Sequence, residues 1–84
     1  MYEIKFKEKA FRYFNKLNKF DQKKIGKKIE KLKENPQLGI PLIGNLSGLW
    51  KLRIGKYRVI YQIRKAELLI FILDIGHRKN IYHK

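Results

Sequence analysis

The sequence predicts an α+β fold in which a helical hairpin packs on one face of a mostly antiparallel, four-stranded sheet. Three observations support this prediction: a short alternating segment at the start, two segments with helical periodicity, and three strand-like segments in the second half. The predicted order is therefore β-α-α-β-β-β. Because 84 residues with 44% hydrophobic content suffice for one small core, we expect a single domain over residues 1–84.

The first strand and first helix are predicted from the spacing of apolar residues. Residues 2–6, YEIKF, alternate between the two faces of a strand. From residue 7 to about residue 18, apolar side chains recur every three or four positions, which predicts a helix with one buried stripe. That stripe consists of Ala10, Phe11, Phe14 and Leu17.

A second helix is predicted over residues 20–34, after a turn at residues 18–21 that supplies capping side chains. Its apolar stripe consists of Ile25, Ile29 and Leu32. Pro36 disfavours a helical conformation at the residue before it and so ends the helix. Residues 35–48 hold several large aliphatic side chains, and we expect them to form a loop that lies over the core.

Three strands are predicted in the C-terminal half, at residues 49–54, 57–64 and 67–75. The first two flank Gly55-Lys56, and glycine at the first position of a two-residue loop is typical of a type II′ hairpin turn. The third strand, ELLIFILDI, is almost continuously apolar. We therefore expect it at the centre of the sheet, covered on both faces.

The register of the hairpin decides which side chains share a face. With the turn at Gly55-Lys56, Arg53 lies opposite Arg58, and strand alternation places Lys51 on the same face. The other face then holds a continuous apolar set for the helices to cover, made up of Trp50, Leu52, Ile54, Tyr57, Val59 and Tyr61. The face away from the helices needs a cover, a ligand or a partner.

The opposed arginines cost stability, since like charges directly across an antiparallel pair destabilise it by about 0.2–1 kcal/mol. One interpretation is that they are ordinary surface cations of a lysine-rich chain. The other is a phosphate-binding site, because the guanidinium group binds phosphate through two parallel N–H donors. A sheet face that bears Lys51, Arg53 and Arg58 could hold such a phosphate.

The charge balance indicates a polyanionic partner. Twenty-one Lys and Arg against seven Asp and Glu give a formal charge of +14. This excess favours nucleic acid first, an acidic protein second and an anionic membrane third.

Composition also limits the expected cellular location of the protein and the kinds of reactive or metal-binding site that it can contain. Charges interrupt the N-terminal segment, and the apolar run at residues 68–73 is far shorter than a membrane span. We therefore expect no signal peptide, no membrane association and a cytoplasmic location. The chain has no cysteine and only two histidines, so neither disulfides nor thiolate chemistry are possible, and no metal site or cofactor is predicted.

The C-terminal segment DIGHRKNIYHK contains a second group of basic and aromatic residues. Arg78 could contact a phosphate, and Tyr82 could stack on a base. His77 and His83 are further candidates, since the unperturbed pKa of histidine lies near neutrality. The alternative interpretation is a frayed basic terminus.

Two segments, LSGLWKLRIGKYRVIYQI and LLIFILDIGHRKNIY, resemble the RelE/ParE superfamily of toxins from bacterial and archaeal toxin–antitoxin pairs. The similarity extends over essentially the whole chain and implies the RelE-like microbial ribonuclease fold. RelE-like members, or mRNA interferases, are ribosome-dependent endoribonucleases that cut mRNA in the ribosomal A site and so inhibit translation. ParE-like members share the fold, poison DNA gyrase and generally lack the full set of nuclease residues.

Carried over position by position, the active-site cations of this superfamily correspond to Lys51, Arg53, Arg58 and Arg78, and its tail tyrosine to Tyr82. Arg53 stands where the best-known RelE pattern has lysine. The hairpin and the tail are each shorter than in that pattern, which loosens the register of the tyrosine. The Tyr82-His83 pair is similar to the His-Tyr ending of the YoeB branch.

RNA can be cut by its own 2′-hydroxyl, provided that a proton is removed, the phosphorane charge is offset and the leaving oxygen is protonated. We hypothesise that Lys51, with a pKa lowered by the neighbouring cations, acts as base or as electrostatic aid. His77 is the competing acid–base candidate. The remaining hypothesised roles are phosphorane stabilisation by Arg58, leaving-group support by Arg78, phosphate orientation by Arg53 and base stacking by Tyr82.

The lysines of the second predicted helix are either a solvated face or a surface that grips ribosomal RNA. They are Lys23, Lys24, Lys27, Lys28 and Lys31. Three functions stay open at this point: a RelE-type nuclease, a ParE-type gyrase inhibitor, and a non-catalytic nucleic-acid-binding relative. Either toxin implies a cognate acidic antitoxin, RelB-like in the first case, that folds as it binds.

Overall fold

The computed structural model describes residues 1–78, which form two helices and one five-stranded sheet, joined by short 3₁₀ turns. The regular elements are β1 (Glu3–Phe6), α1 (Glu8–Lys16), α2 (Lys19–Glu30), β2 (Ile40–Pro41), β3 (Trp50–Ile54), β4 (Tyr57–Arg64) and β5 (Leu69–His77). The 3₁₀ turns are η1 (Lys31–Lys33), η2 (Pro36–Leu38), η3 (Gly44–Leu46) and η4 (Lys65–Glu67).

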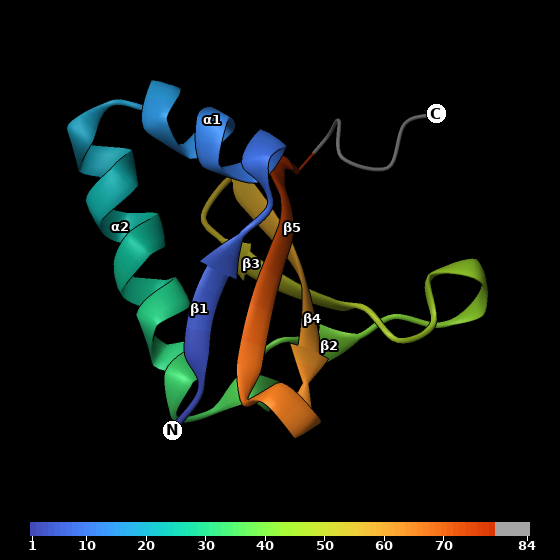
Figure 1. Cartoon of the computed structure of the whole chain (residues 1–84). Helices are drawn as coiled ribbons and strands as arrows, with labels where there is room; N and C mark the ends of the chain where they lie inside the picture. The colour runs from blue at the N-terminus through green and yellow to red at the C-terminus, as the bar shows by residue number, and fades with distance from the viewer. Residues whose placement is uncertain (79–84) are drawn as a thin grey trace.

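The strands lie in the order β1-β5-β4-β3-β2, with β1 parallel to β5 and the other neighbours antiparallel. Both helices lie on one side of this sheet (Figure 1). The predicted α+β class is confirmed, but the sheet has five strands where four were expected. The missed strand, β2, pairs only Ile40 with Lys51 and Pro41 with Trp50. Two residues show no alternation, and proline is tolerated in a strand only at an edge such as this.

The core lies between the helices and the sheet. The helices contribute Ala10, Ile25 and Ile29, and the turn η1 contributes Leu32. From the sheet come Leu52, Ile54, Tyr57, Val59, Tyr61, Ile70, Ile72 and Ile75. Burial on the sheet thus follows the face that the hairpin register predicts. Of the expected first-helix stripe, Phe11 is half exposed and packs edge-on against Phe6, with ring centroids 6.0 Å apart.

The two helices are joined by polar contacts at their shared corner. Asn18 caps α2 by accepting a hydrogen bond from the Asp21 amide at 2.8 Å. The Gln22 side chain donates to the carbonyl oxygens of Phe14 and Leu17 at the end of α1, each at 3.1 Å. The helical hairpin is therefore a rigid support for the sheet.

No helix within residues 1–78 is both long and apolar enough to span a membrane.

The last strand is only partly as expected. It was expected at the centre of the sheet and is an interior strand, between β1 and β4, although the middle strand of the five is β4. It starts at Leu69 because the chain reverses at Leu68, whose φ is +52°. Ile60 faces Asp74 while Tyr61 faces Ile72, so β5 carries a bulge at this point. The expectation that both faces of β5 are covered is wrong. Helices cover one face only, and Phe71 on the other is half buried under the Arg64 guanidinium, 4.9 Å from the ring centroid.

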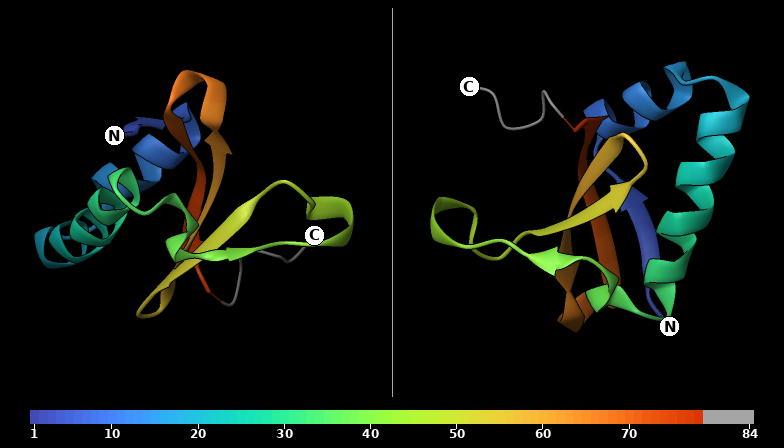
Figure 2. Two further views of the ribbon diagram at one scale, coloured as in Figure 1. Left: turned by 90° about the horizontal axis from the view of Figure 1, so that it is seen from below. Right: turned by 180° about the vertical axis from the view of Figure 1, so that it is seen from behind.

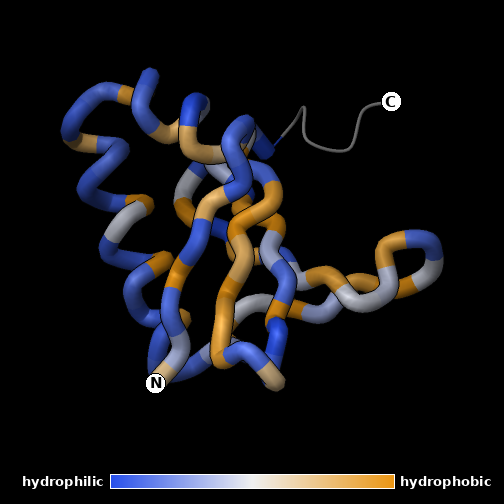
Figure 3. Tube along the Cα trace, viewed as in Figure 1, coloured by the Kyte–Doolittle hydropathy of each residue, from blue (hydrophilic) through white to orange (hydrophobic). Residues whose placement is uncertain are grey.

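Residues 42–49, which we call the arm, contradict the expectation that this loop lies over the core. The arm projects from the sheet on the side away from the helices (Figures 1 and 2). Ile43 is 86% exposed, and Figure 3 shows hydrophobic residues along the projection. The Leu42 amide donates to the Leu49 carbonyl at 2.8 Å, which closes the base of the arm. Positive φ angles at Gly44 and Gly48 turn the chain within it.

Two glycines give a matched test of the packing. An alanine methyl at Gly39 would overlap the Lys51 carbonyl oxygen and approach the Tyr61 hydroxyl to 2.9 Å. We expect Gly39→Ala to lower the free energy of unfolding by about 1–3 kcal/mol. At Gly26, inside α2, the methyl would meet the Phe14 ring at an ordinary 3.8 Å. Gly26→Ala should raise stability by roughly 0.5–1 kcal/mol through helix propensity.

Chemical denaturation of both variants measures the difference. Equal effects of Gly39→Ala and Gly26→Ala would contradict the packing around Gly39.

Candidate functional site

The β3–β4 hairpin has the predicted register. Ile54 pairs with Tyr57, Arg53 with Arg58, and Lys51 with Ile60. Gly55 has a φ of +58°, the left-handed conformation that the first residue of this tight turn needs. Since the alternate residues are buried under the helices, the charged side chains point to the opposite side, which we call the open face.

The end of β5 lies beside these cations. Arg58 pairs with Gly76, which has no side chain to occupy the adjoining space, and Ile60 pairs with Asp74. The Asp74 carboxylate reaches the Lys9 amine at 3.6 Å. Asp74 is not among the residues that the sequence pattern predicted for this face. Strand alternation from Gly76 places Asp74 on this face, because the bulge in β5 begins only after the Ile60–Asp74 pair.

Arg78 lies next to the turn of the hairpin. Its amide donates to the Lys56 carbonyl at 2.8 Å, and its guanidinium donates to the Gly55 carbonyl at 3.3 Å. Arg78, which directly follows β5, therefore lies at the turn end of the hairpin, near Arg53 and Arg58. Tyr82 and His83, the remaining tail candidates, lie outside the described residues.

Lys51 is half buried in the middle of the open face. Burial, followed by the positive charges of Arg58 and Arg53, lowers the pKa of its amine below the usual value. The predicted influence of the neighbouring cations is present, although burial is the larger cause. A lysine with a lowered pKa can exist as a free amine at lower pH than an ordinary surface lysine.

His77 lies on the other face of the sheet. It pairs with Tyr57, whose side chain packs in the core, and the two ring centroids are 6.3 Å apart in an edge-on arrangement. Since Gly76 is the residue that faces Arg58, His77 points away from the hairpin cations. The structure therefore does not bring this acid–base candidate together with Lys51.

The predicted lysine surface of α2 is on the side of the sheet opposite to the open face. Lys23, Lys24 and Lys27 are exposed on α2, as is Lys31 at the start of η1, while Lys28 is half buried. Figure 3 shows most of α2 as hydrophilic. The sheet lies between this lysine surface and the open face, but the Lys24 amine reaches the hairpin turn and lies beside Gly55.

A hydrogen bond that the sequence did not reveal joins α2 to the hairpin. The Tyr57 hydroxyl donates to the Asp21 carboxylate at 2.7 Å across 36 residues of sequence. This bond is the main cause of a lowered pKa at Asp21, and it raises the pKa of Tyr57 to about 12. No local pattern could have predicted it, because neither residue lies near the other in sequence.

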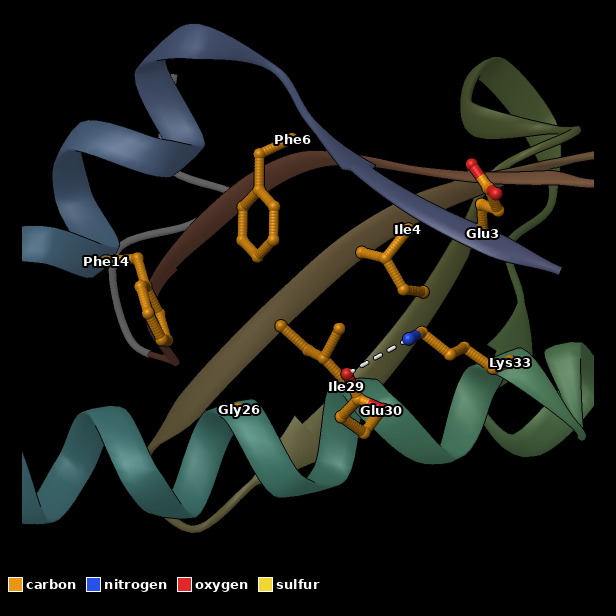
Figure 4. Close-up of a pocket in the computed structure, with 8 residues that line it drawn as sticks. All are labelled: Glu3, Ile4, Phe6, Phe14, Gly26, Ile29, Glu30 and Lys33. Atoms are coloured by element: carbon orange, nitrogen blue, oxygen red, sulfur yellow. Dashed lines mark ion pairs between the residues drawn. The ribbon is translucent and has the colours of Figure 1, made fainter.

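Cavities lie on both sides of the sheet. One, of about 670 Å³, lies on the open face between the arm and β5, where Ile60 and Leu73 meet Lys7 and Lys9. Another, of about 450 Å³, lies between β1 and α2 beside the Glu30–Lys33 ion pair (Figure 4). Neither cavity is lined by any of the predicted catalytic residues. Within residues 1–78 no three His, Asp or Glu side chains come together in a way that could hold a metal ion.

Comparison with known proteins gives consistent matches. The family model described as the ParE toxin of the type II toxin–antitoxin system, parDE, matches residues 4–82. A RelE-like toxin protein of Escherichia coli is 30% identical over 80 residues, which are 93% of this chain and 84% of that protein. The mRNA interferase toxin RelE of Escherichia coli K12 is 25% identical over the same shares.

Among solved structures, the toxin–antitoxin complex RelBE2 of Mycobacterium tuberculosis contains a chain with this fold. The TM-score is 0.83 and the identity 29%, over 92% of this chain and 98% of that one. The family match covers nearly the whole chain, and both relatives are toxins of the same superfamily. The chain therefore belongs to the ParE toxin family of type II toxin–antitoxin systems, within the RelE/ParE superfamily.

Proposed function

We propose that this toxin is a ribosome-dependent endoribonuclease that cleaves mRNA in the A site and thereby inhibits translation. One observation carries the proposal: the hairpin register places Lys51, Arg53 and Arg58 on the open face, with Arg78 bonded to the turn beside them. The similarity to the mRNA interferase toxin RelE supports it. A cluster of cations with two arginines opposite each other suits a phosphate group in a displacement reaction.

In the proposed reaction, the 2′-oxygen of a nucleotide bonds to the adjacent phosphorus and the bond from phosphorus to the 5′-oxygen breaks. The products are a cyclic phosphate and a free 5′-hydroxyl. The Lys51 amine either removes the 2′-hydroxyl proton as a base or, when protonated, offsets the negative charge that develops on the 2′-oxygen. Arg58 stabilises the charge of the phosphorane. Arg53 orients the phosphate, Arg78 supports the leaving oxygen, and Tyr82 stacks on a base.

This set lacks an evident strong acid, since His77 points to the other face. The leaving 5′-oxygen therefore takes its proton from water, and the ribosome compensates in rate by holding the message in an attack-ready geometry, an effect worth up to roughly 7–11 kcal/mol. The lysines of the α2 surface would bind ribosomal RNA phosphates on the opposite side of the sheet. Such contacts make binding strongly dependent on salt.

The proposed partner in the resting state is an acidic, RelB-like antitoxin. A net charge of +14 favours an acidic partner, and the similar fold in RelBE2 was solved in a toxin–antitoxin complex. Growth arrest by the toxin alone, relieved by co-expression of the neighbouring gene, is the expected behaviour.

A second candidate is inhibition of DNA gyrase by protein contact, because the family model that matches is named for ParE. A translation extract with a defined mRNA separates the two functions. We expect cleavage at A-site codons only when ribosomes are present. Intact mRNA together with trapped gyrase–DNA complexes would support the gyrase function.

In the same extract, Arg58→Ala should reduce the cleavage rate about 10²–10³-fold, because one charge-stabilising donor is lost. The matched control is Arg12→Ala on α1, which removes one arginine that is ion-paired with Glu8 and is not among the proposed catalytic residues. This control should cleave at the wild-type rate. Unchanged cleavage by Arg58→Ala would contradict the assignment of Arg58.

Arg53→Thr should separate stability from activity. Removing one of two opposed like charges should raise the free energy of unfolding by about 0.2–1 kcal/mol. Cleavage should nevertheless fall by about 10²-fold if Arg53 binds the phosphate. Thermal unfolding and the cleavage assay measure the two effects. A variant that is both more stable and fully active would indicate that these arginines are ordinary surface cations.

The titration of Lys51 distinguishes its two hypothesised roles. NMR of the lysine side chains should show a pKa below 10.5 for Lys51, and Arg53→Thr should raise it because a neighbouring positive charge is removed. If the free amine is the base, the single-turnover rate increases with pH up to that pKa. A rate that decreases as Lys51 loses its proton would assign catalysis to the positive charge instead.

A further inference from the structure

The tip of the β3–β4 hairpin, residues 54–57, is held from two directions. On the helix side, the Tyr57 hydroxyl donates to Asp21 at 2.7 Å, and the Lys24 amine lies so near Gly55 that a Cβ there would be 2.7 Å from it. On the strand side, the Arg78 amide and guanidinium donate to the Lys56 and Gly55 carbonyls. The tip is thus fastened between α2 and the end of β5.

Asp21 is itself fixed in place. Its amide donates to the Asn18 side-chain oxygen at 2.8 Å, and its carboxylate accepts from the Asn18 amide group at 3.2 Å. It belongs to the first turn of α2, which Gln22 ties to the end of α1. The carboxylate therefore presents a rigid acceptor to Tyr57.

Tyr57 passes this constraint to the other side of the tip. It is 7% exposed, and its ring packs edge-on against His77, the residue that precedes Arg78. A continuous set of contacts consequently runs from Asp21 through Tyr57 and His77 to Arg78. Arg53 and Arg58 adjoin this set, since each lies one residue from the Ile54–Tyr57 pair.

We propose that the Tyr57–Asp21 hydrogen bond is a latch that positions the hairpin tip and Arg78 for the reaction, with Tyr57 and Asp21 as positioning residues. Neither residue touches the substrate, because both lie on the helix side of the sheet. This inference rests on the proposed nuclease function. It explains why a hydroxyl and a carboxylate meet at the edge of an otherwise apolar core.

A positioning role and a folding role predict different effects when the Tyr57 hydroxyl is removed. The core retains its apolar contacts when one hydroxyl is removed, so the fold should persist. Phosphate-binding side chains, by contrast, must be held within about 0.5 Å of the productive geometry. A displacement of about 1 Å can lower a rate by about 10²-fold.

The chain offers a matched control on the same strand. Tyr61 also donates its hydroxyl to a remote acceptor, the Pro36 carbonyl at 2.7 Å, and accepts from the Gly39 amide. Its bonds hold η2 and the loop before β2, away from the hairpin tip. Tyr57→Phe and Tyr61→Phe therefore remove the same group from two buried tyrosines of β4.

The first measurement is single-codon cleavage on programmed ribosomes, with kcat and KM determined separately. We expect Tyr57→Phe to lower kcat by about tenfold or more with KM nearly unchanged. Tyr61→Phe should leave kcat close to wild type even if it lowers the melting temperature as much. Asp21→Asn, which keeps an acceptor for the hydroxyl, should retain most of the activity that Asp21→Ala loses.

The second measurement does not depend on activity. Hydrogen exchange at the Arg78 amide, which bonds to Lys56 at the tip, should accelerate in Tyr57→Phe and not in Tyr61→Phe. A wild-type protein that leaves mRNA intact would overturn the nuclease function, and exchange would still decide whether the latch exists. Equal kcat values and equal exchange rates in the two tyrosine variants would overturn the latch.

Discussion

The two-residue turn at Gly55-Lys56 is the constraint on which the rest of the structure depends. It fixes the register of β3 against β4, and a shift by one residue would exchange the two faces of both strands. In the observed register the helices cover an apolar face and the charges share the other. The same turn receives the hydrogen bonds of Arg78, so it also organises the end of β5.

The open face contains a repulsion between like charges that contributes nothing to the stability of the fold. Arg53 opposes Arg58, and burial followed by the charges of these two arginines lowers the pKa of Lys51. A bound phosphate would relieve this repulsion, as the proposed nuclease function requires. Gly76, which has no side chain, pairs with Arg58, and Asp74 on the same strand pairs with Ile60.

Positive charge is present on both sides of the sheet, carried mainly by lysines on one side and by a pair of arginines on the other. Lysines dominate the outer surface of α2, while the opposed arginines are on the open face of the sheet. A lysine surface suits contact with many phosphates, whereas arginine suits one phosphate held in a defined geometry. The sheet between them would let one face dock while the other reacts, with the Tyr57–Asp21 bond as a direct polar link across the helix–sheet boundary.

The sequence by itself determined the helical hairpin, the order of the main strands and the hairpin face that bears the cations, because these follow from local periodicity and one glycine turn. Only the tertiary structure decided the edge strand β2, the projecting arm, the bulge in β5 beyond the Ile60–Asp74 pair, and the separation of His77 from Lys51. Each of these depends on pairing between segments far apart in the chain. Such pairing leaves no periodic signal in either segment, so no reading of the sequence could have supplied it.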